Sequence, residues 1–204
     1  MKICKIDGCE VKMYGKGYCL KHYTQIKRHG HILCRTKYDP NEFIVNGDIV
    51  TIILYDQYGV ETARAIVDKD DIEVVKRHKW CANKFGSVSY CATRIGAEIL
   101  YIHHLLVGKK KIDHRNRNGL DNRRSNLREC THQQNLFNVG LRKDNISGSK
   151  GVSKSGNKWS AEISKSGNKL RLGYFDTPQM AAVAYNEAAK KLFGEFAYLN
   201  QVQP

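Results

Sequence analysis

Long apolar runs and acidic side chains are both scarce in this chain of 204 residues. No apolar run approaches the roughly 18 residues that a membrane span requires, so no span is predicted. The first ten residues, MKICKIDGCE, also lack the apolar core of a signal peptide. We therefore expect a cytosolic protein, located in the host cytosol if a phage encodes it.

Asp and Glu number 20 against 34 Lys and Arg, which gives a formal net charge of +14. Such an excess favours a polyanionic partner. Nucleic acid is favoured over a membrane surface because no predicted amphipathic helix combines a basic face with an apolar one. Positive charge is concentrated in residues 1–40 and 101–204, whereas acids outnumber bases in 41–100. We interpret the basic blocks as nucleic-acid contacts and the middle block as a scaffold.

The seven cysteines are an odd number in a chain without an export signal, which argues for reduced thiols or metal ligands rather than disulfides. Three thiolates and one imidazole complete a tetrahedral zinc shell, and zinc supplies folding free energy that a small segment lacks. His29 and His31 are alternative candidates for the histidine ligand, but His22, two residues after Cys19, has the better spacing. A short basic helix should follow and end at Gly30. The expected ligands follow a C-x4-C-x9-C-x2-H pattern and are Cys4, Cys9, Cys19 and His22.

Residues 39–102 are predicted to form mainly β-strands. Runs of β-branched and aromatic residues lie on both sides of the sequence NGD, which is a strong hairpin signal. A short helix is expected over DKDDIEVVKRHKW. Its acidic first turn is interpreted as solvated and favourable for the helix dipole, rather than as a metal site. The acids of this turn are Asp68, Asp70 and Asp71.

The segment Ile112–Asn138 combines residue types that suit chemistry on a phosphate. Asp113 and His114 stand side by side at the end of a predicted strand, so their side chains should point opposite ways. A turn-rich loop and a short strand follow, and a capping-box signal at Thr131 starts a helix that carries Asn135. We expect a ββα unit closing over one cation. A carboxylate, a histidine and amides in so basic a segment indicate metal-assisted chemistry.

This spacing resembles the HNH (ββα-metal) nuclease family, close to the phage and intron-borne homing endonucleases with the pattern DH…DNR..NLR..t..QN. Upstream, YIHHLLVG is similar to the family's lead-in, with His103 at its histidine position and His104 where arginine is usual. The resemblance implies metal-dependent hydrolysis of phosphodiester bonds in double-stranded DNA.

Individual roles are also implied by this resemblance. His114 would be the general base, and His103 would be a further catalytic residue. Asn126 would brace the loop that orients His114. A neutral imidazole accepts a proton near pH 7. One carboxylate and one amide with several waters suit Mg²⁺ or Mn²⁺ better than zinc, and the implied ligands are Asp113 and Asn135. The loop arginines expected to contact DNA are Arg115, Arg117, Arg123 and Arg124.

Residues 149–204 predict three short strands that turn at two SGN sequences, followed by one helix. Thr177 and Pro178 give that helix a cap and a proline at its first position. Strict alternation assigns every second residue of the strands to the core. The expected inward set is Trp159, Ala161, Ile163, Leu170, Leu172 and Tyr174, and the expected outward set is Ser160, Glu162, Ser164, Lys169, Arg171 and Gly173.

This block resembles the ethylene-response-factor (Apetala-type) DNA-binding domain through KGV, KWSAEI, LGYFDT, AAVAYNEAA and FGEFAYLN. The resemblance implies that the open face of the sheet enters the major groove. Ser153 and Ser164 stand where plant members favour arginine, so the plant target sequence is not transferred. Trp159 is equally a core candidate. The residues at or beside the matching DNA-contact positions are Lys150, Lys154, Lys158, Trp159, Glu162, Lys169 and Arg171.

The sequence therefore predicts an α+β chain of several modules. These are a zinc-binding module over 1–36, an HNH nuclease over 39–138, a linker over 139–148 and an ethylene-response-factor-like domain over 149–204. The predicted function is a homing-type, metal-dependent endonuclease acting on double-stranded DNA. Two alternatives stay open, a non-catalytic DNA-binding regulator descended from such a nuclease and an RNA-directed binder. The target site, nicking or double-strand cleavage, and the oligomeric state are open as well.

Overall fold

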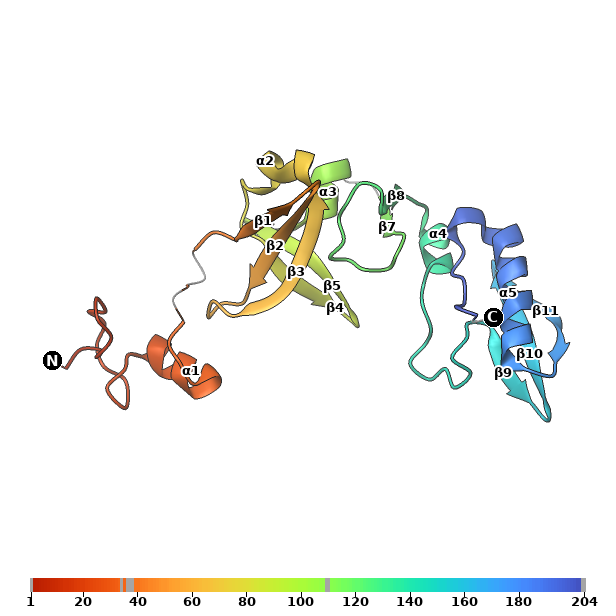
Figure 1. Ribbon diagram of the computed structural model, residues 1–204, viewed down its shortest axis with the longest axis horizontal. Coiled ribbons are helices and arrows are strands. Elements are labelled where there is room, and N and C mark those ends of the chain that lie inside the picture. The colour runs from red at the N-terminus through yellow and green to blue at the C-terminus, as the bar shows by residue number, and fades with distance from the viewer. Residues whose placement is uncertain (1, 34, 36–38, 109–110, 203–204) are drawn as a thin grey trace. The chain divides into compact units, whose positions relative to one another are not determined.

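The computed structural model describes residues 2–33, 35, 39–108 and 111–202. The chain divides into two compact units. The first comprises Met1–Val107 and Gly119–Arg124, and the second comprises Gly108–Asn118 and Ser125–Pro204. Both consist of small antiparallel sheets with a few helices, which confirms the α+β class (Figure 1). The module boundary expected at residue 36 lies outside the described residues.

The first unit begins with a small module around helix α1, Leu20–His29. Ahead of α1, two isolated antiparallel bridges join Ile3 to Lys12 and Gly15 to Tyr18. Helix α1 ends at Gly30, whose φ of 77° lies in the left-handed region that glycine adopts without strain. The predicted basic helix and its end are thus confirmed.

Two three-stranded sheets form the scaffold of the first unit, each in sequential order. The hairpin predicted at NGD connects the first two strands. Trp80 and Ile102 are completely buried in the core that these sheets share with α3. The elements are β1 (Phe43–Asn46), β2 (Ile49–Tyr55), β3 (Glu61–Asp68), η1 (Lys69–Asp71), α2 (Ile72–Val75), β4 (Cys81–Phe85), β5 (Val88–Ile95), β6 (Glu98–Tyr101) and α3 (Ile102–Val107).

The second unit contains a two-stranded ribbon with its helix and a three-stranded sheet of order β11-β10-β9 covered by α5. Thr177 caps α5 by accepting a hydrogen bond from the backbone N–H of Met180, as its sequence predicts. The elements are β7 (Ile112–His114), β8 (Leu127–Glu129), α4 (His132–Phe137), β9 (Val152–Ser155), β10 (Lys158–Lys165), β11 (Asn168–Phe175), α5 (Pro178–Phe193) and η2 (Gly194–Phe196).

Helix α5 lies so close to the sheet that Gly151 admits no side chain. A Cβ there would stand 2.2 Å from Cδ2 of Tyr185 and 2.4 Å from the carbonyl oxygen of Glu162. Its φ of 72° also favours glycine. Helical spacing predicts an apolar stripe on this helix over Ala181, Ala184, Tyr185, Ala188 and Leu192. Ala181 and Tyr185 are buried and the other three are half-buried. The remaining buried residues of α5 are Ala182, Ala189 and Phe193.

A β-bulge in β11 makes part of the predicted sheet alternation wrong. The register shifts between Ala161 and Glu162, so Gly173 pairs with Ala161 and Arg171 pairs with Glu162. Because the bulge adds one residue, the strand beyond it has the opposite alternation. Tyr174 consequently pairs with Ser160 on the outer face and is 49% exposed, whereas Gly173 faces the helix side. Leu170, which was predicted to face inward, pairs with Ile163, but its side chain is 55% exposed on the edge strand β11.

Among the described residues, no helix has the length and apolar character needed to cross a membrane.

Candidate active site

The segment from Ile112 to Phe137 forms the predicted ββα unit. Strands β7 and β8 pair antiparallel, with Asp113 opposite Arg128 and His114 opposite Leu127. Helix α4 then begins after Thr131, whose side chain and that of Gln134 complete the predicted capping box. The loop between the strands is shared, because residues 119–124 belong to the first unit.

Asp113 is 5% exposed and is held by an ion pair. Arg128, its cross-strand neighbour, donates from Nε and Nη2 to Oδ2 of Asp113 at 2.8 and 2.5 Å. The Arg128 side chain is itself only 7% exposed, so both charges are removed from water. Loss of one partner of such a pair costs about 3–5 kcal/mol because it leaves the other charge buried alone.

Asn138, the C-cap residue of α4, also holds Asp113. Its Nδ2 lies 2.9 Å from Oδ1 and 3.0 Å from Oδ2 of Asp113, and 2.9 Å from the carbonyl oxygen of His114. Asn138 is 3% exposed. The amide therefore fixes the end of α4 against the end of β7. No role was predicted from the sequence for Arg128 or Asn138, although Arg128 is the last residue of the motif triplet NLR and Asn138 the last residue of LFN.

His114 and Asn126 lie at the two ends of the loop that joins β7 and β8. His114 is 5% exposed. The side-chain oxygen of Asn126 accepts from the backbone N–H of Asn116 at 3.0 Å, and its amide donates to the side-chain oxygen of Asn116 at 3.0 Å. The backbone carbonyl of Asn126 accepts from the N–H of Arg115 at 2.9 Å. Asn126 thus ties the residues directly after His114 to the start of β8.

The donor set around Asp113 fits a hard divalent cation. Oδ2 accepts from both nitrogens of Arg128 and from Asn138, whereas among the described residues the bonded partner of Oδ1 is Asn138. A carboxylate oxygen has two lone pairs, so Oδ1 retains one for a metal. Asn135 lies three residues before Asn138 on α4, and residues at that spacing share a helix face. One carboxylate and one amide oxygen are ligands that Mg²⁺ or Mn²⁺ accepts.

The loop over residues 119–124 is anchored to the first unit rather than extended into solvent. Arg124 donates from Nη2 to Oδ1 of Asp71 at 2.7 Å, and its backbone N–H donates to Asp68 at 2.7 Å. Asp71 is 4% exposed, so the prediction that this acidic turn is solvated was wrong for Asp71. The folding back of the loop is the physical reason. A Cβ at Gly119 would lie 2.6 Å from the carbonyl oxygen of Ser89, which shows how closely the loop approaches β5.

The four arginines expected to contact DNA all have partners within the protein. Arg123 pairs with Asp121 at 2.7 Å and Arg115 pairs with Glu195 at 2.7 Å. Arg117 lies over the ring of Tyr198 at 4.4 Å. The Arg115 and Arg124 side chains are still 45% and 56% exposed, so contact with DNA stays a prediction for them.

His103 lies on α3 of the first unit, within a cluster of rings. Its ring stacks on Tyr101 at 5.5 Å with an interplanar angle of 16° and meets His104 at 4.4 Å. The side chain is 7% exposed. His103 was identified from the sequence only by its position in the motif. Its aromatic neighbours Tyr90 and Tyr101 come from the antiparallel pair β5 and β6.

The four predicted zinc ligands converge in the N-terminal module. Nδ1 of His22 lies 3.2 Å from Sγ of Cys4 and 3.4 Å from Sγ of Cys19, and the Sγ atoms of Cys9 and Cys19 are 3.9 Å apart. All four ligand atoms lie within 4.8 Å of one another. Zinc bonds of about 2.0–2.3 Å in a tetrahedron separate ligand atoms by roughly 3.3–3.8 Å, so the cluster fits this ion.

Electrostatics in this cluster favour thiolate at one position. Burial alone would raise the pKa of the Cys4 thiol, but hydrogen bonds from the backbone at Ile6 and Cys19 and from His22 lower it to about 6. Thiolate is the form that binds a metal. His29 and His31, the competing ligands considered from the sequence, are not members of the cluster.

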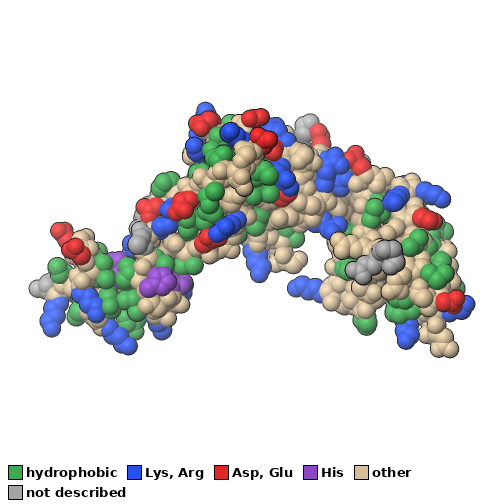
Figure 2. Space-filling view, viewed as in Figure 1, with side chains coloured by type: hydrophobic (Ala, Val, Ile, Leu, Met, Phe, Trp, Pro, Cys, Tyr) green, Lys and Arg blue, Asp and Glu red, His purple; other side chains and the backbone are tan. Residues whose placement is uncertain are grey.

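The outer face of the C-terminal sheet carries four of the seven residues of this module that were expected to contact DNA. Glu162, Arg171 and Tyr174 form a chain there, in which Arg171 donates to Glu162 at 2.8 Å and to the Tyr174 hydroxyl at 2.9 Å. By register, Lys158 and Lys169 share this face with Ser155 and Ser164. Lys and Arg side chains are spread over every part of the surface seen in Figure 2.

Three of the expected contact residues lie elsewhere. Trp159 packs half-buried against the core on the helix side, as its alternation predicted, and Lys154 pairs with it on that side. The ammonium of Lys150 donates to the carbonyl oxygens of Phe137 at 2.9 Å and Val139 at 2.6 Å. Burial, and secondarily the charge of Arg117, lowers the pKa of Lys150 to about 8. Lys150 thus joins the end of α4 to the C-terminal sheet.

Comparison with known proteins matches the same segment. The sequence model of a family described as HNH endonuclease matches residues 107–136. An uncharacterized HNH endonuclease of Acanthamoeba polyphaga mimivirus is 35% identical over 145 residues, which cover 68% of this chain and 75% of the relative. No solved structure gives a significant match to the chain.

Proposed function

This chain belongs to the HNH endonuclease family, and on that premise we propose that it is a homing-type enzyme that hydrolyses double-stranded DNA at or near a recognition site. The observation that supports this best is the ββα unit, which brings Asp113 and His114 to the end of β7 and joins that end to α4. The enzyme class and a DNA substrate follow from the family. The homing character and the residue roles are the proposal.

In this mechanism His114 accepts the proton of the attacking water. Asn126 holds the backbone at Arg115 and Asn116 and so limits the orientations of the histidine before them. Asp113 and Asn135 would hold Mg²⁺ or Mn²⁺, with the Asp113 carboxylate bound by Arg128 and Asn138. When bound, the cation stabilises negative charge on the phosphate and the leaving oxygen. His103 is proposed as the accompanying histidine of the family pattern.

Zinc is proposed to be bound by Cys4, Cys9, Cys19 and His22, where it serves the fold of the N-terminal module. The C-terminal module is proposed as an ethylene-response-factor-like DNA-binding sheet, although Lys150, Lys154 and Trp159 are left out of its contact face. Phosphate contacts of such a sheet fix position on the duplex. A cytosolic location, in a host cell if the gene is viral, stays a prediction.

Incubation of the full chain with supercoiled plasmid, in Mg²⁺ and in EDTA, tests the proposed reaction. We expect cleavage in Mg²⁺ alone, and sequencing the ends from a random DNA library should show a recognition site and whether one or both strands are cut. His114→Ala should lower the cleavage rate about 10²–10⁴-fold while duplex binding is retained. Cleavage by this variant at the wild-type rate contradicts the assignment.

Two other outcomes would favour the alternative functions. Tight duplex binding without cleavage in Mg²⁺ or Mn²⁺ would indicate a non-catalytic regulator. Displacement of duplex DNA by RNA at equal concentration would indicate an RNA-directed protein.

A further inference from the structure

Arg128 connects the proposed metal ligand to the C-terminal module. On one side its Nε and Nη2 bind Asp113. On the other side Nη1 donates to the backbone carbonyl of Glu195 and lies 3.7 Å from the Glu195 carboxylate. The guanidinium also lies 4.0 Å over the ring of Phe196. All three neighbours of Arg128 are in the second unit, and two of them belong to η2, the short turn after α5.

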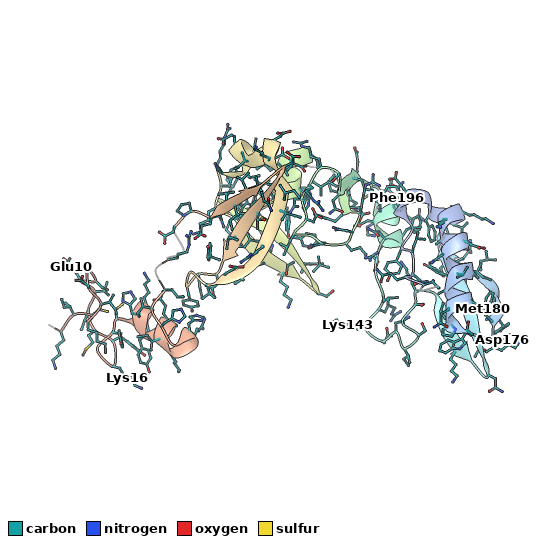
Figure 3. The ribbon with its side chains drawn as sticks, in the orientation of Figure 1. Glu10, Lys16, Lys143, Asp176, Met180 and Phe196 are labelled. Carbon is teal, nitrogen blue, oxygen red and sulfur yellow. The ribbon has the colours of Figure 1, made fainter. Side chains whose placement is uncertain are left out.

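The η2 turn is held firmly enough to position this guanidinium. Phe196 is 8% exposed and lies where the chain leaves α5 and passes α4 (Figure 3). Just before it, Phe193 of α5 stacks on Phe137 of α4 at 3.9 Å with an interplanar angle of 17°. Lys150 binds the carbonyls at the end of the same helix. Helix α4 and the β7–β8 ribbon are therefore built onto the C-terminal module, although the sequence suggested a linker between them.

We propose that Arg128 is a positioning residue that presents Oδ1 of Asp113 to the divalent cation, and that the Gly194–Phe196 turn holds Arg128 in place. Arg128 binds Oδ2 through two nitrogens, whereas among the described residues Oδ1 accepts from Asn138 and keeps one lone pair for the metal. The ring of Phe196 and the carbonyl of Glu195 fix the plane of the guanidinium, and a planar fork determines the orientation of the carboxylate that it binds. The C-terminal module is then a structural part of the metal site as well as a surface for DNA.

This inference rests on the proposed role of Asp113 as a metal ligand. Groups that orient a metal ligand typically contribute 10–100-fold to metal affinity or activity. Arg128→Gln should therefore weaken Mn²⁺ binding by about that factor, and Arg128→Lys, which keeps the charge but loses the fork, should weaken it less. Phe196→Leu keeps an apolar side chain under the guanidinium but removes the ring, and should weaken Mn²⁺ binding severalfold.

Mn²⁺ binding can be measured without turnover in zinc-loaded full chain carrying His114→Ala, with a duplex present to supply the phosphate. The paramagnetic resonance signal of free Mn²⁺ reports affinity, and a melting curve reports folding. In protein that carries His114→Ala, Mn²⁺ affinity is read directly from this signal. In protein that keeps His114, the Mn²⁺ concentration that gives half-maximal cleavage is a second readout. Without added Mn²⁺, the duplex affinity of the zinc-loaded protein should change less than about twofold in every variant, since none of these residues is on the outer sheet face.

Two control variants separate positioning from general damage. Phe175→Leu removes a ring from β11 of the C-terminal sheet, where Phe175 and Trp159 pack against the core cluster that contains Val152. Arg64→Gln removes an arginine from an exposed pair with Glu61 in the first unit. Both should leave Mn²⁺ affinity unchanged.

Folded Arg128→Gln or Arg128→Lys protein with wild-type Mn²⁺ affinity overturns the role of Arg128. Folded Phe196→Leu protein with wild-type affinity overturns the role of the turn, even if Arg128→Gln fails to fold. Absence of Mn²⁺ binding by the parental protein, or absence of cleavage by wild type, instead contradicts the proposed function.

Discussion

The side-chain amide of Asn138 lies within 3.0 Å of both carboxylate oxygens of Asp113, and this contact closes the ββα unit. The amide reaches back from the C-cap residue of α4 to strand β7, more than twenty positions earlier in the sequence. It also binds the carbonyl oxygen of His114. The relative placement of the proposed base and the proposed metal ligand therefore depends on one buried asparagine.

Asn138→Ala should destabilise the protein by about 1–3 kcal/mol, because it leaves a buried carboxylate and a buried carbonyl without this donor. Urea unfolding of the full chain measures the change. Asn157→Ala is the matched control, since Asn157 is exposed in the turn between β9 and β10 and its loss should stay within about 0.5 kcal/mol. Equal stability of the two variants would contradict the role of Asn138.

Removal of zinc should unfold the N-terminal module and leave the β-rich scaffold folded. The scaffold has its own core around Trp80 and Ile102, whereas the module has few buried apolar side chains besides its ligands. Cys19→Ser should lower the zinc content from one per chain to none, measured by atomic absorption. Hydrogen exchange should accelerate in α1 and stay slow in β2 and β3.

Cys81→Ser is the control for the zinc experiment, because Cys81 is exposed on the edge strand β4. Its zinc content should equal that of wild type. Zinc retained in Cys19→Ser would show that another side chain completes the shell.

Lys150 should make stability depend on pH in the alkaline range. Burial and the charge of Arg117 lower its pKa in the folded protein from 10.5 to about 8. Between these values the unfolded chain binds the proton and the folded protein does not, so the free energy of unfolding rises with pH. The wild-type free energy minus that of Lys150→Met should increase from pH 7 to pH 10. A difference that stays constant or decreases contradicts this assignment.

Affinity for duplex DNA should fall steeply with salt, because the proposed sheet contacts phosphates. Lys169→Gln should reduce the slope of log Kd against log salt by about one if its ammonium neutralises one phosphate. Fluorescence anisotropy with a short nonspecific duplex, in the absence of added Mg²⁺ or Mn²⁺, measures the slope. Lys191→Gln on α5 is the control and should keep the wild-type slope. A flat salt dependence of the wild-type protein would contradict the proposed interface.

The sequence by itself determined the local elements and the candidate residues for metal binding and catalysis. Turn and cap signals at NGD, Thr131, Thr177 and Gly30 act within a few residues, so their hairpin, helix starts and helix end were predicted correctly. The cluster of proposed zinc ligands was predictable from the sequence because two short spacings bring four rare side chains together. The roles assigned to Asp113, His114, Asn126 and Asn135 come from motif spacing and stay predictions.

Only the tertiary structure decided which partners these residues have. Nothing in the local sequence relates Arg124 to Asp71, or Arg128 to Glu195 and Phe196, because those pairs are separated by 53 to 68 positions. The bulge in β11 likewise reversed the faces of Gly173 and Tyr174, since one inserted residue changes a period of two without leaving a sequence signal. Long-range packing buries these charges and brings the β7–β8 ribbon against the C-terminal module. These contacts fix the side chains of the proposed site.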